Sequence, residues 1–239
     1  MRLHWLVKSP IAAACALLAS LVVAHADDRD CQGVESLLDN PKISLGAIDP
    51  KAARAYFFRN GAEGKDCPTP SEKCRAGSYL VPGDQIALSR RNGAFVCAEF
   101  VDAKGRARSG WLLASDVASP APVALADWIG SWSREEATIT MKTASKAGAL
   151  SIKGLATFGG SDPERVRRGA VNSGEIEGVV MPNGADLSFT MGDNGATLPL
   201  EHGEGCKVWM GRLGRFILVS DNSGCGGLNV SFSGVYARK

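Results

Sequence analysis

The sequence predicts an all-β protein, and three features of its 239 residues support this fold class. Short apolar segments are separated by turn signals, and glycine is abundant with 28 residues. The second half of the chain contains no segment that reads as a helical interruption. At the end of the chain, Leu228, Val230, Phe232 and Tyr236 alternate with polar residues, which is typical of a half-buried antiparallel strand over 228–238.

Residues 1–26 have the features of an export signal. Two basic residues, Arg2 and Lys8, precede an apolar run of 13 residues at 11–23, and a small-x-small site ends at Ala26. The run is shorter than the ~20 residues that span a bilayer. We therefore predict cleavage after Ala26, a periplasmic location, and no stable membrane insertion of the mature chain.

The charge of the mature chain argues against nucleic acid as a partner. The full sequence has 27 Lys and Arg and 25 Asp and Glu, and the signal removes two of the basic residues. The mature chain is therefore neutral, whereas nucleic-acid-binding proteins carry a basic surface.

The mature chain keeps an even number of cysteines, which are Cys31, Cys67, Cys74, Cys97, Cys206 and Cys225. An even number in an exported protein predicts a disulfide framework. Short separations favour the pairs Cys67–Cys74 and Cys206–Cys225, which leaves Cys31–Cys97. The competing interpretation is a zinc site, but there is no Cys-x-x-Cys pair and the one remaining histidine, His202, is isolated. We expect no metal and no cofactor.

A short Pro/Ala segment at 118–122 predicts a boundary between two β domains. The expected organisation is a signal (1–26), an N-terminal arm (27–49), a first domain (50–118), a linker (119–126) and a second domain (127–239). Within the arm, residues 34–38 favour one or two helical turns that stop at Asn40-Pro41.

The first domain has an aromatic opening strand at 55–58, a Tyr79-Leu80-Val81-Pro82-Gly83-Asp84 step, a strand at 95–100 and a Gly110-Trp111-Leu112 ending. Together these motifs resemble a bacterial SH3-type domain, over about 65 residues. The resemblance implies a small SH3-like barrel that binds cell-wall peptides. Four aromatic residues would line its groove, namely Tyr56, Phe58, Tyr79 and Trp111. The alternative is that Trp111, and Phe57 or Phe58, are core residues.

The second domain is expected to be an antiparallel up-and-down barrel, because closure removes exposed strand edges. The expected strands are 128–134, 137–142, 149–158, 175–181, 185–191, 197–201, 206–211, 215–220 and 228–238. The Pro182-Asn183-Gly184 segment predicts a hairpin between two of them. The pair Cys206–Cys225 would join the open end of the hairpin at 206–220.

Two residues of the second domain resemble a feature of lipocalin-like barrels. Gly130-Ser131-Trp132 lies in the first strand, and Arg238 ends the last strand. The resemblance implies that Trp132 stacks on Arg238 as a structural pair, a contact worth about 0.5–2 kcal/mol. The longest connection, at 158–169, carries Arg165, Arg167 and Arg168 and would form a ligand-binding lid over the barrel mouth, or a solvated loop.

The sequence favours a binding protein over an enzyme. A serine triad would need His202 in a glycine-rich turn, and there is no Gly-x-Ser-x-Gly motif. We expect a periplasmic protein that binds peptidoglycan or a cell-wall-acting protein, such as a lysozyme-like muramidase. One alternative is a carrier of small apolar ligands in a barrel cavity lined by Ile139, Leu187, Phe189, Met191 and Val230. A second alternative is a cell-wall hydrolase centred on His202.

Overall fold

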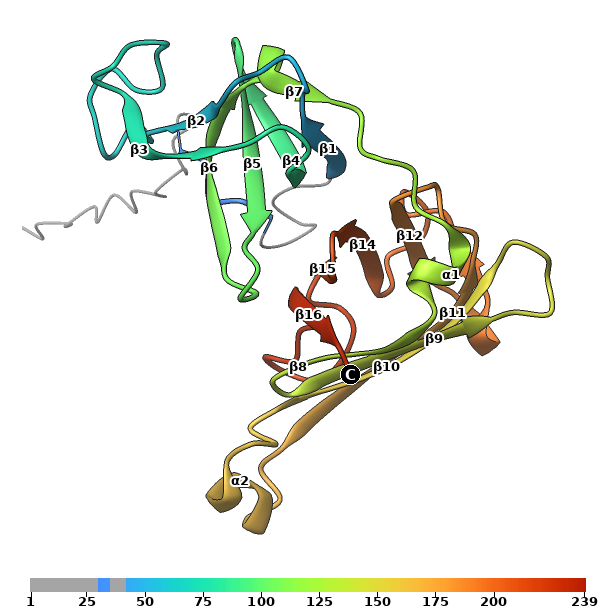
Figure 1. Ribbon diagram of the computed structural model, residues 1–239. Helices are drawn as coiled ribbons and strands as arrows, with labels where there is room; N and C mark the ends of the chain where they lie inside the picture. Colours follow the sequence, from blue (N-terminus) through green and yellow to red (C-terminus); the bar gives the residue numbers. More distant parts are fainter. Residues whose placement is uncertain (1–29, 35–41) are drawn as a thin grey trace, which may run out of the picture.

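The computed structural model describes residues 30–34 and 42–239. The export signal expected at 1–26 and most of the helical turns expected at 34–38 lie outside these ranges. In the described ranges the protein is all-β, with two antiparallel sheets (Figure 1). Three disulfides link parts of these ranges. None of the helices found there has the length and apolar character needed to cross a lipid bilayer.

The first sheet is a half-barrel with the strand order β3-β2-β6-β5-β4-β1-β7. Its strands are β1 (Ser44–Ile48), β2 (Ala55–Phe58), β3 (Arg75–Leu80), β4 (Gln85–Asn92), β5 (Phe95–Val101), β6 (Ala107–Leu113) and β7 (Val117–Ala118). A short 3-10 helix, η1 (Ala114–Asp116), precedes β7. Strand β1 comes from the range expected to be an arm, and it pairs with both β4 and β7. The first sheet therefore begins at Ser44.

The second sheet is a nearly closed barrel with the strand order β11-β10-β9-β8-β16-β15-β14-β12-β13. Its strands are β8 (Gly130–Arg134), β9 (Ala137–Thr143), β10 (Leu150–Phe158), β11 (Asn172–Val180), β12 (Asp186–Met191), β13 (Thr197–Leu198), β14 (Lys207–Leu213), β15 (Phe216–Asp221) and β16 (Gly234–Arg238). Its helical turns are α1 (Leu125–Trp128), α2 (Pro163–Arg167) and η2 (Asp193–Gly195). The last strand pairs with the first, through Ala237 with Ser133 and Arg238 with Trp132.

The barrel is not closed between β11 and β12, which is where the sequence predicted a hairpin. The turn forms, because Asn183 N donates a hydrogen bond to Asp186 O and Gly184 adopts a φ of 63°. However, β11 pairs with β10, and β12 pairs with β13 and β14, so the expected hairpin between β11 and β12 is wrong. Strand β13 folds back over this gap, and Thr197 Oγ1 bridges it by donating to Val179 O at 2.8 Å.

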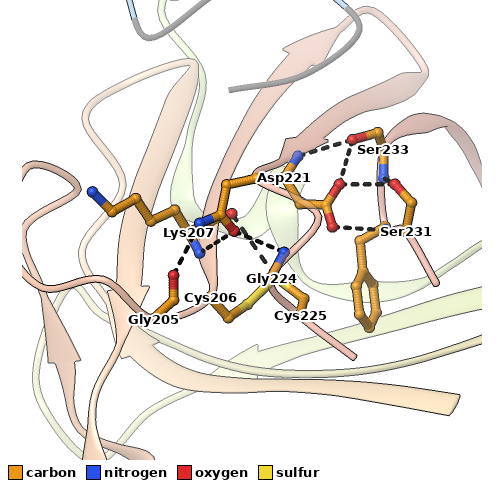
Figure 2. The surroundings of a disulfide bond; sticks show 10 residues. Gly205, Cys206, Lys207, Asp221, Gly224, Cys225, Ser231 and Ser233 are labelled. Atoms are coloured by element: carbon orange, nitrogen blue, oxygen red, sulfur yellow. Dashed lines mark hydrogen bonds between the residues drawn. A yellow bond between two sulfur atoms is a disulfide. The ribbon is translucent and has the colours of Figure 1, made fainter. Parts of the chain in front are cut away.

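The strand expected over 228–238 is also wrong in its first half, since β16 begins only at Gly234. Val230 and Phe232 are buried as the alternation predicted, but Leu228 is 78% exposed. The cause is Asp221, a fully buried carboxylate at the end of β15. It accepts hydrogen bonds from the chain at 231–233 and holds that segment in an irregular path across the end of the barrel (Figure 2).

The Trp132–Arg238 contact is confirmed. The guanidinium carbon of Arg238 lies 4.8 Å from the centre of the Trp132 ring, and that of Arg212 lies 4.7 Å from it. One Nη of Arg238 also donates to the carbonyls of Asp127 and Ile129, at 2.8 and 2.9 Å. These contacts attach the end of the chain to the segment that begins the second domain.

Replacing Arg238 with alanine is therefore expected to lower the free energy of unfolding by about 2 kcal/mol, because a cation–π contact and two carbonyl contacts are lost. Urea denaturation followed by circular dichroism measures this change. Lys239→Ala is the control, because Lys239 is the next residue along the chain and its side chain is exposed. Equal midpoints for the two variants would contradict the structural role of Arg238.

The buried phenol of Tyr236 makes the stability of the barrel dependent on pH. Its hydroxyl donates to Phe232 O at 2.8 Å, and burial raises its pKa to about 12. An unfolded tyrosine ionises near pH ~10, so stability is fully present below that pH and is lost as the pH rises toward 12. The tyrosine absorbance titration of the protein minus that of Tyr236→Phe should show a midpoint near 12. A difference curve with an unshifted midpoint would contradict this assignment.

The two sheets pack on each other through an apolar interface. The outward-facing side chains of β14 and β15 form one cluster with residues of the first domain, and its buried members are Val34, Ala87, Val101, Trp209, Leu213, Phe216 and Leu218. A hydrogen bond of 2.6 Å from Gly214 N to Gln85 Oε1 crosses the interface. Gly211 is required there, because a Cβ would lie 2.5 Å from the Trp209 ring and 2.9 Å from Leu45.

Candidate functional site

Two of the four aromatic residues expected in the groove are core residues. Trp111 has no exposed surface and Phe58 is 6% exposed. They form a cluster with Phe95 and four half-cystines, and partly buried Tyr56 packs against it. The expected groove is therefore not formed by these four side chains together, because both Phe58 and Trp111 face a second core on the outer side of the sheet.

The disulfides explain why this outer face is covered. The bond Cys31–Cys97 fixes the arm to β5, and Cys67–Cys74 closes the loop between β2 and β3. Asn60 in that loop holds the arm, because its Oδ1 accepts from Cys31 N at 2.8 Å. All three predicted disulfides are confirmed, including Cys206–Cys225 beside the second-domain hairpin (Figure 2).

The other two predicted residues, Tyr56 and Tyr79, form an accessible pair. They are register partners on β2 and β3, with ring centres 5.6 Å apart. Arg54 lies 4.4 Å from the Tyr79 ring and Arg75 lies 4.6 Å from the Tyr56 ring. Tyr79 is 41% exposed. Of the four predicted aromatic residues, it is the one that lines a groove at the mouth of the first domain.

A groove of about 670 Å³ opens at the mouth of the half-barrel, between β3 and the β5–β6 hairpin. Its floor is apolar and consists of Phe57, Leu80 and Phe100. Its rim is polar and charged, and consists of Ser78, Tyr79, Asp102, Arg106, Arg108 and Ser109. A concave apolar site with a few polar groups is the arrangement of most ligand-binding sites. The groove is therefore the strongest candidate site.

The turn of the β5–β6 hairpin holds one part of the rim in a fixed conformation. Asp102 accepts from the backbone of Lys104 and Arg106 and forms an ion pair of 2.7 Å with the Arg106 side chain. The Arg106 side chain, and then its backbone, lowers the pKa of Asp102 to about 2 by hydrogen bonding. Gly105 allows the turn with a φ of 80°, and Phe216 of the second domain packs beside it. The second domain thus supports the rim.

Arg108 supplies the charge that the groove presents to a ligand. It is exposed, and its guanidinium carbon lies 5.7 Å from the centre of the Phe57 ring. Among the described residues no carboxylate forms an ion pair with Arg108, whereas Arg106 is already paired with Asp102. A guanidinium beside an apolar floor suits a ligand that carries a carboxylate. Ser78 Oγ in the adjacent wall has no hydrogen-bonding partner within residues 30–34 and 42–239.

A second cavity, of about 420 Å³, lies between the two domains. It is lined by Gln32, Val34, Glu99, Ala107, Ser109, Ser233 and Gly234. Glu99 is only 6% exposed, and its Oε2 accepts a hydrogen bond of 2.6 Å from Val34 N. Ala107 and Ser109 line this cavity as well as the groove. The two hollows therefore meet at the first half of β6.

The three arginines expected to form a lid lie elsewhere. Figure 1 shows α2 at the outer end of the β10–β11 ribbon, and not over the barrel mouth as predicted. Arg165 stacks on Phe158 at 4.6 Å, Arg167 pairs with Glu164, and Arg168 Nε donates to Glu164 O. These contacts satisfy the arginines within the projecting tip and do not bring them together as a pocket.

The barrel interior is packed with side chains. Ile139, Leu187, Phe189 and Val230 lie in one hydrophobic cluster with three large aromatic residues, Trp132, Phe232 and Tyr236. Met191 packs against the edge of this cluster. The arrangement favours a filled core over the ligand cavity that a carrier requires.

His202 lies in an exposed turn, in which its backbone N–H donates to Pro199 O. In the described part of the chain its side chain has no hydrogen bond to a hydroxyl or carboxylate group. No group of three or more His, Cys, Asp or Glu that could hold a metal ion occurs among residues 30–34 and 42–239. Nothing in this geometry favours the hydrolase alternative.

Most of the groove was not predicted from the sequence. Phe57, Phe100 and Arg108 come from three separate strands, and only the turn that holds Asp102 and Arg106, with its glycine, offered a local signal. Comparison with protein-family models, with curated protein sequences and with solved structures gives no match to this chain. The site is therefore interpreted from its own geometry.

Proposed function

We propose that this protein is an exported binding protein of the cell wall that holds a carboxylate-bearing peptide in the groove of its first domain. The observation that carries the proposal is the position of Arg108, an exposed guanidinium beside an apolar floor and without a carboxylate partner among the described residues. Such a site binds and orients a ligand, and we assign it no chemical step.

Two further observations support this function. The resemblance of residues 50–118 to bacterial SH3-type domains, which are binding modules, implies recognition rather than catalysis. Peptidoglycan stem peptides and the extended segments of cell-wall-acting proteins both carry carboxylates, which is the chemistry that Arg108 selects. The barrel supports the groove through Phe216 and presents its own loops as a surface for a partner.

Binding to purified sacculi and to lysozyme tests the proposal, because these probes separate wall binding from inhibitor-like binding of a wall-acting protein. We expect the protein to bind one of them, and Arg108→Glu to weaken that binding at least about tenfold, because a carboxylate would meet a like charge. Arg91→Glu is the matched control, since Arg91 is an exposed arginine of the same sheet outside the groove.

Equal binding by Arg108→Glu and Arg91→Glu would show that the groove is not the site. Absence of binding to both probes would overturn the assignment to the cell wall.

A further inference from the structure

The first half of β6 has an edge that no strand of the described chain covers. Strand β6 pairs with β5 from Ala107 to Leu113, but β2 reaches it only at Phe58 with Trp111. The chain then leaves β6, because Arg59 N bonds to Cys74 O and the loop closed by Cys67–Cys74 turns away. An uncovered edge presents backbone N–H and C=O groups that can accept another strand.

The two hollows described above lie on opposite faces of the sheet at this edge. Successive residues of a strand point to opposite faces. Arg108 and its register partner Phe100 line the groove, whereas Glu99 lines the cavity between the domains, and Ser109, the partner of Glu99, lines both. A strand added beside Ala107–Ser109 would therefore direct alternate side chains into the groove and into the cavity.

From this arrangement we infer that the protein binds an extended segment of a partner protein as an additional strand on the edge of β6 at Ala107–Ser109. Residues of the segment that face the groove carry a carboxylate, which pairs with Arg108. Residues that face the cavity are small and polar, because they lie beside Glu99 and Ser109. The inference rests on the proposed function and identifies the ligand of the same site.

The geometry favours a protein segment over a stem peptide of the cell wall. Filling both hollows requires regular alternation of side chains along an all-L backbone. Stem peptides mix D and L residues and do not form such a ladder. The other free edges of the first sheet, β3 and β7, do not have a hollow on each face among those described here.

The sharpest test changes the ligand and leaves the protein intact. The probe is a fluorescent six-residue peptide in which Glu alternates with Thr. Two variants carry N-methyl groups, one on every Glu nitrogen and the other on every Thr nitrogen. In an added strand only alternate N–H groups face the neighbouring edge. We expect one variant to bind at least about tenfold more weakly than the unmethylated probe, and the other to stay within about twofold.

Hydrogen exchange and a groove variant complete the experiment. Amide exchange within Ala107–Ser109 should slow when the probe binds, whereas exchange at Gly77 on the β3 edge should not change. Arg108→Ala should weaken the unmethylated probe, and Arg91→Ala should not. Equal effects of the two methylation patterns, or no binding at millimolar probe, would overturn strand addition. Sacculus or lysozyme binding that depends on Arg108 would still stand in that case, so failure of the two proposals can be told apart.

Discussion

Removing the disulfide between the arm and β5, by the double change Cys31→Ala and Cys97→Ala, is expected to lower the free energy of unfolding by about 4 kcal/mol. The bond closes a loop with a sequence separation of 66 residues, and the loss of chain entropy in the unfolded state grows with loop length. The bond also packs against Phe58, Phe95 and Trp111, so its loss removes part of the second core.

Denaturant unfolding of the oxidised protein measures this effect. The matched control is removal of Cys67–Cys74, which lies in the same cluster but has a separation of only 7 residues. Its expected cost is about 2 kcal/mol by the same relation. Equal losses in the two double variants would contradict the assignment of the larger effect to loop length.

Replacing Asp221 with alanine is expected to destabilise the barrel by about 4 kcal/mol. The carboxylate is fully buried, and it accepts hydrogen bonds from Ser231 Oγ at 2.8 Å, Ser233 Oγ at 2.5 Å and Phe232 N at 3.3 Å (Figure 2). Alanine leaves these donors, one buried and two partly buried, without their acceptor, and each such loss costs about 1–3 kcal/mol.

The segment at 231–233 should respond first, because Asp221 accepts hydrogen bonds from two of its hydroxyl groups. Thermal unfolding and hydrogen exchange at Phe232 measure the global and local effects. Asp221→Asn should cost less, since an amide oxygen still accepts. Glu204→Ala, on an exposed turn before the same hairpin, is the control. Full stability in Asp221→Ala would show that the network is not what holds this segment.

The predictions that depended on local pattern agree well with the structure. The spacing of cysteines predicted the disulfides, and the Gly-x-Trp motif with the terminal arginine predicted the Trp132–Arg238 contact. Apolar alternation placed Val230, Phe232 and Tyr236 inside the barrel. These features depend on residue type at fixed separations, which a single sequence records directly.

The predictions that failed depended on long-range neighbours. Trp111 was predicted to bind a ligand because it is a large aromatic residue. However, the arm and the loop closed by Cys67–Cys74 cover the face of the sheet on which it lies. The strand expected from Leu228 begins only at Gly234, because Asp221, on another strand, accepts hydrogen bonds from the backbone and hydroxyl groups of the segment before it. The turn at Asn183 forms as expected, yet the two strands that this turn connects, β11 and β12, do not pair, and β13 lies between them.

The sequence alone determined that this is an all-β chain with three disulfides, because the strand period, turn chemistry and cysteine spacing are local properties of the polypeptide. Only the tertiary structure decided where the candidate groove forms. The groove joins Phe57, Tyr79 and Arg108 from three strands, and Phe216 of the other domain supports its rim. Such a site depends on which strands pair and which edge stays uncovered, and that pairing is decided by the burial of distant side chains against one another.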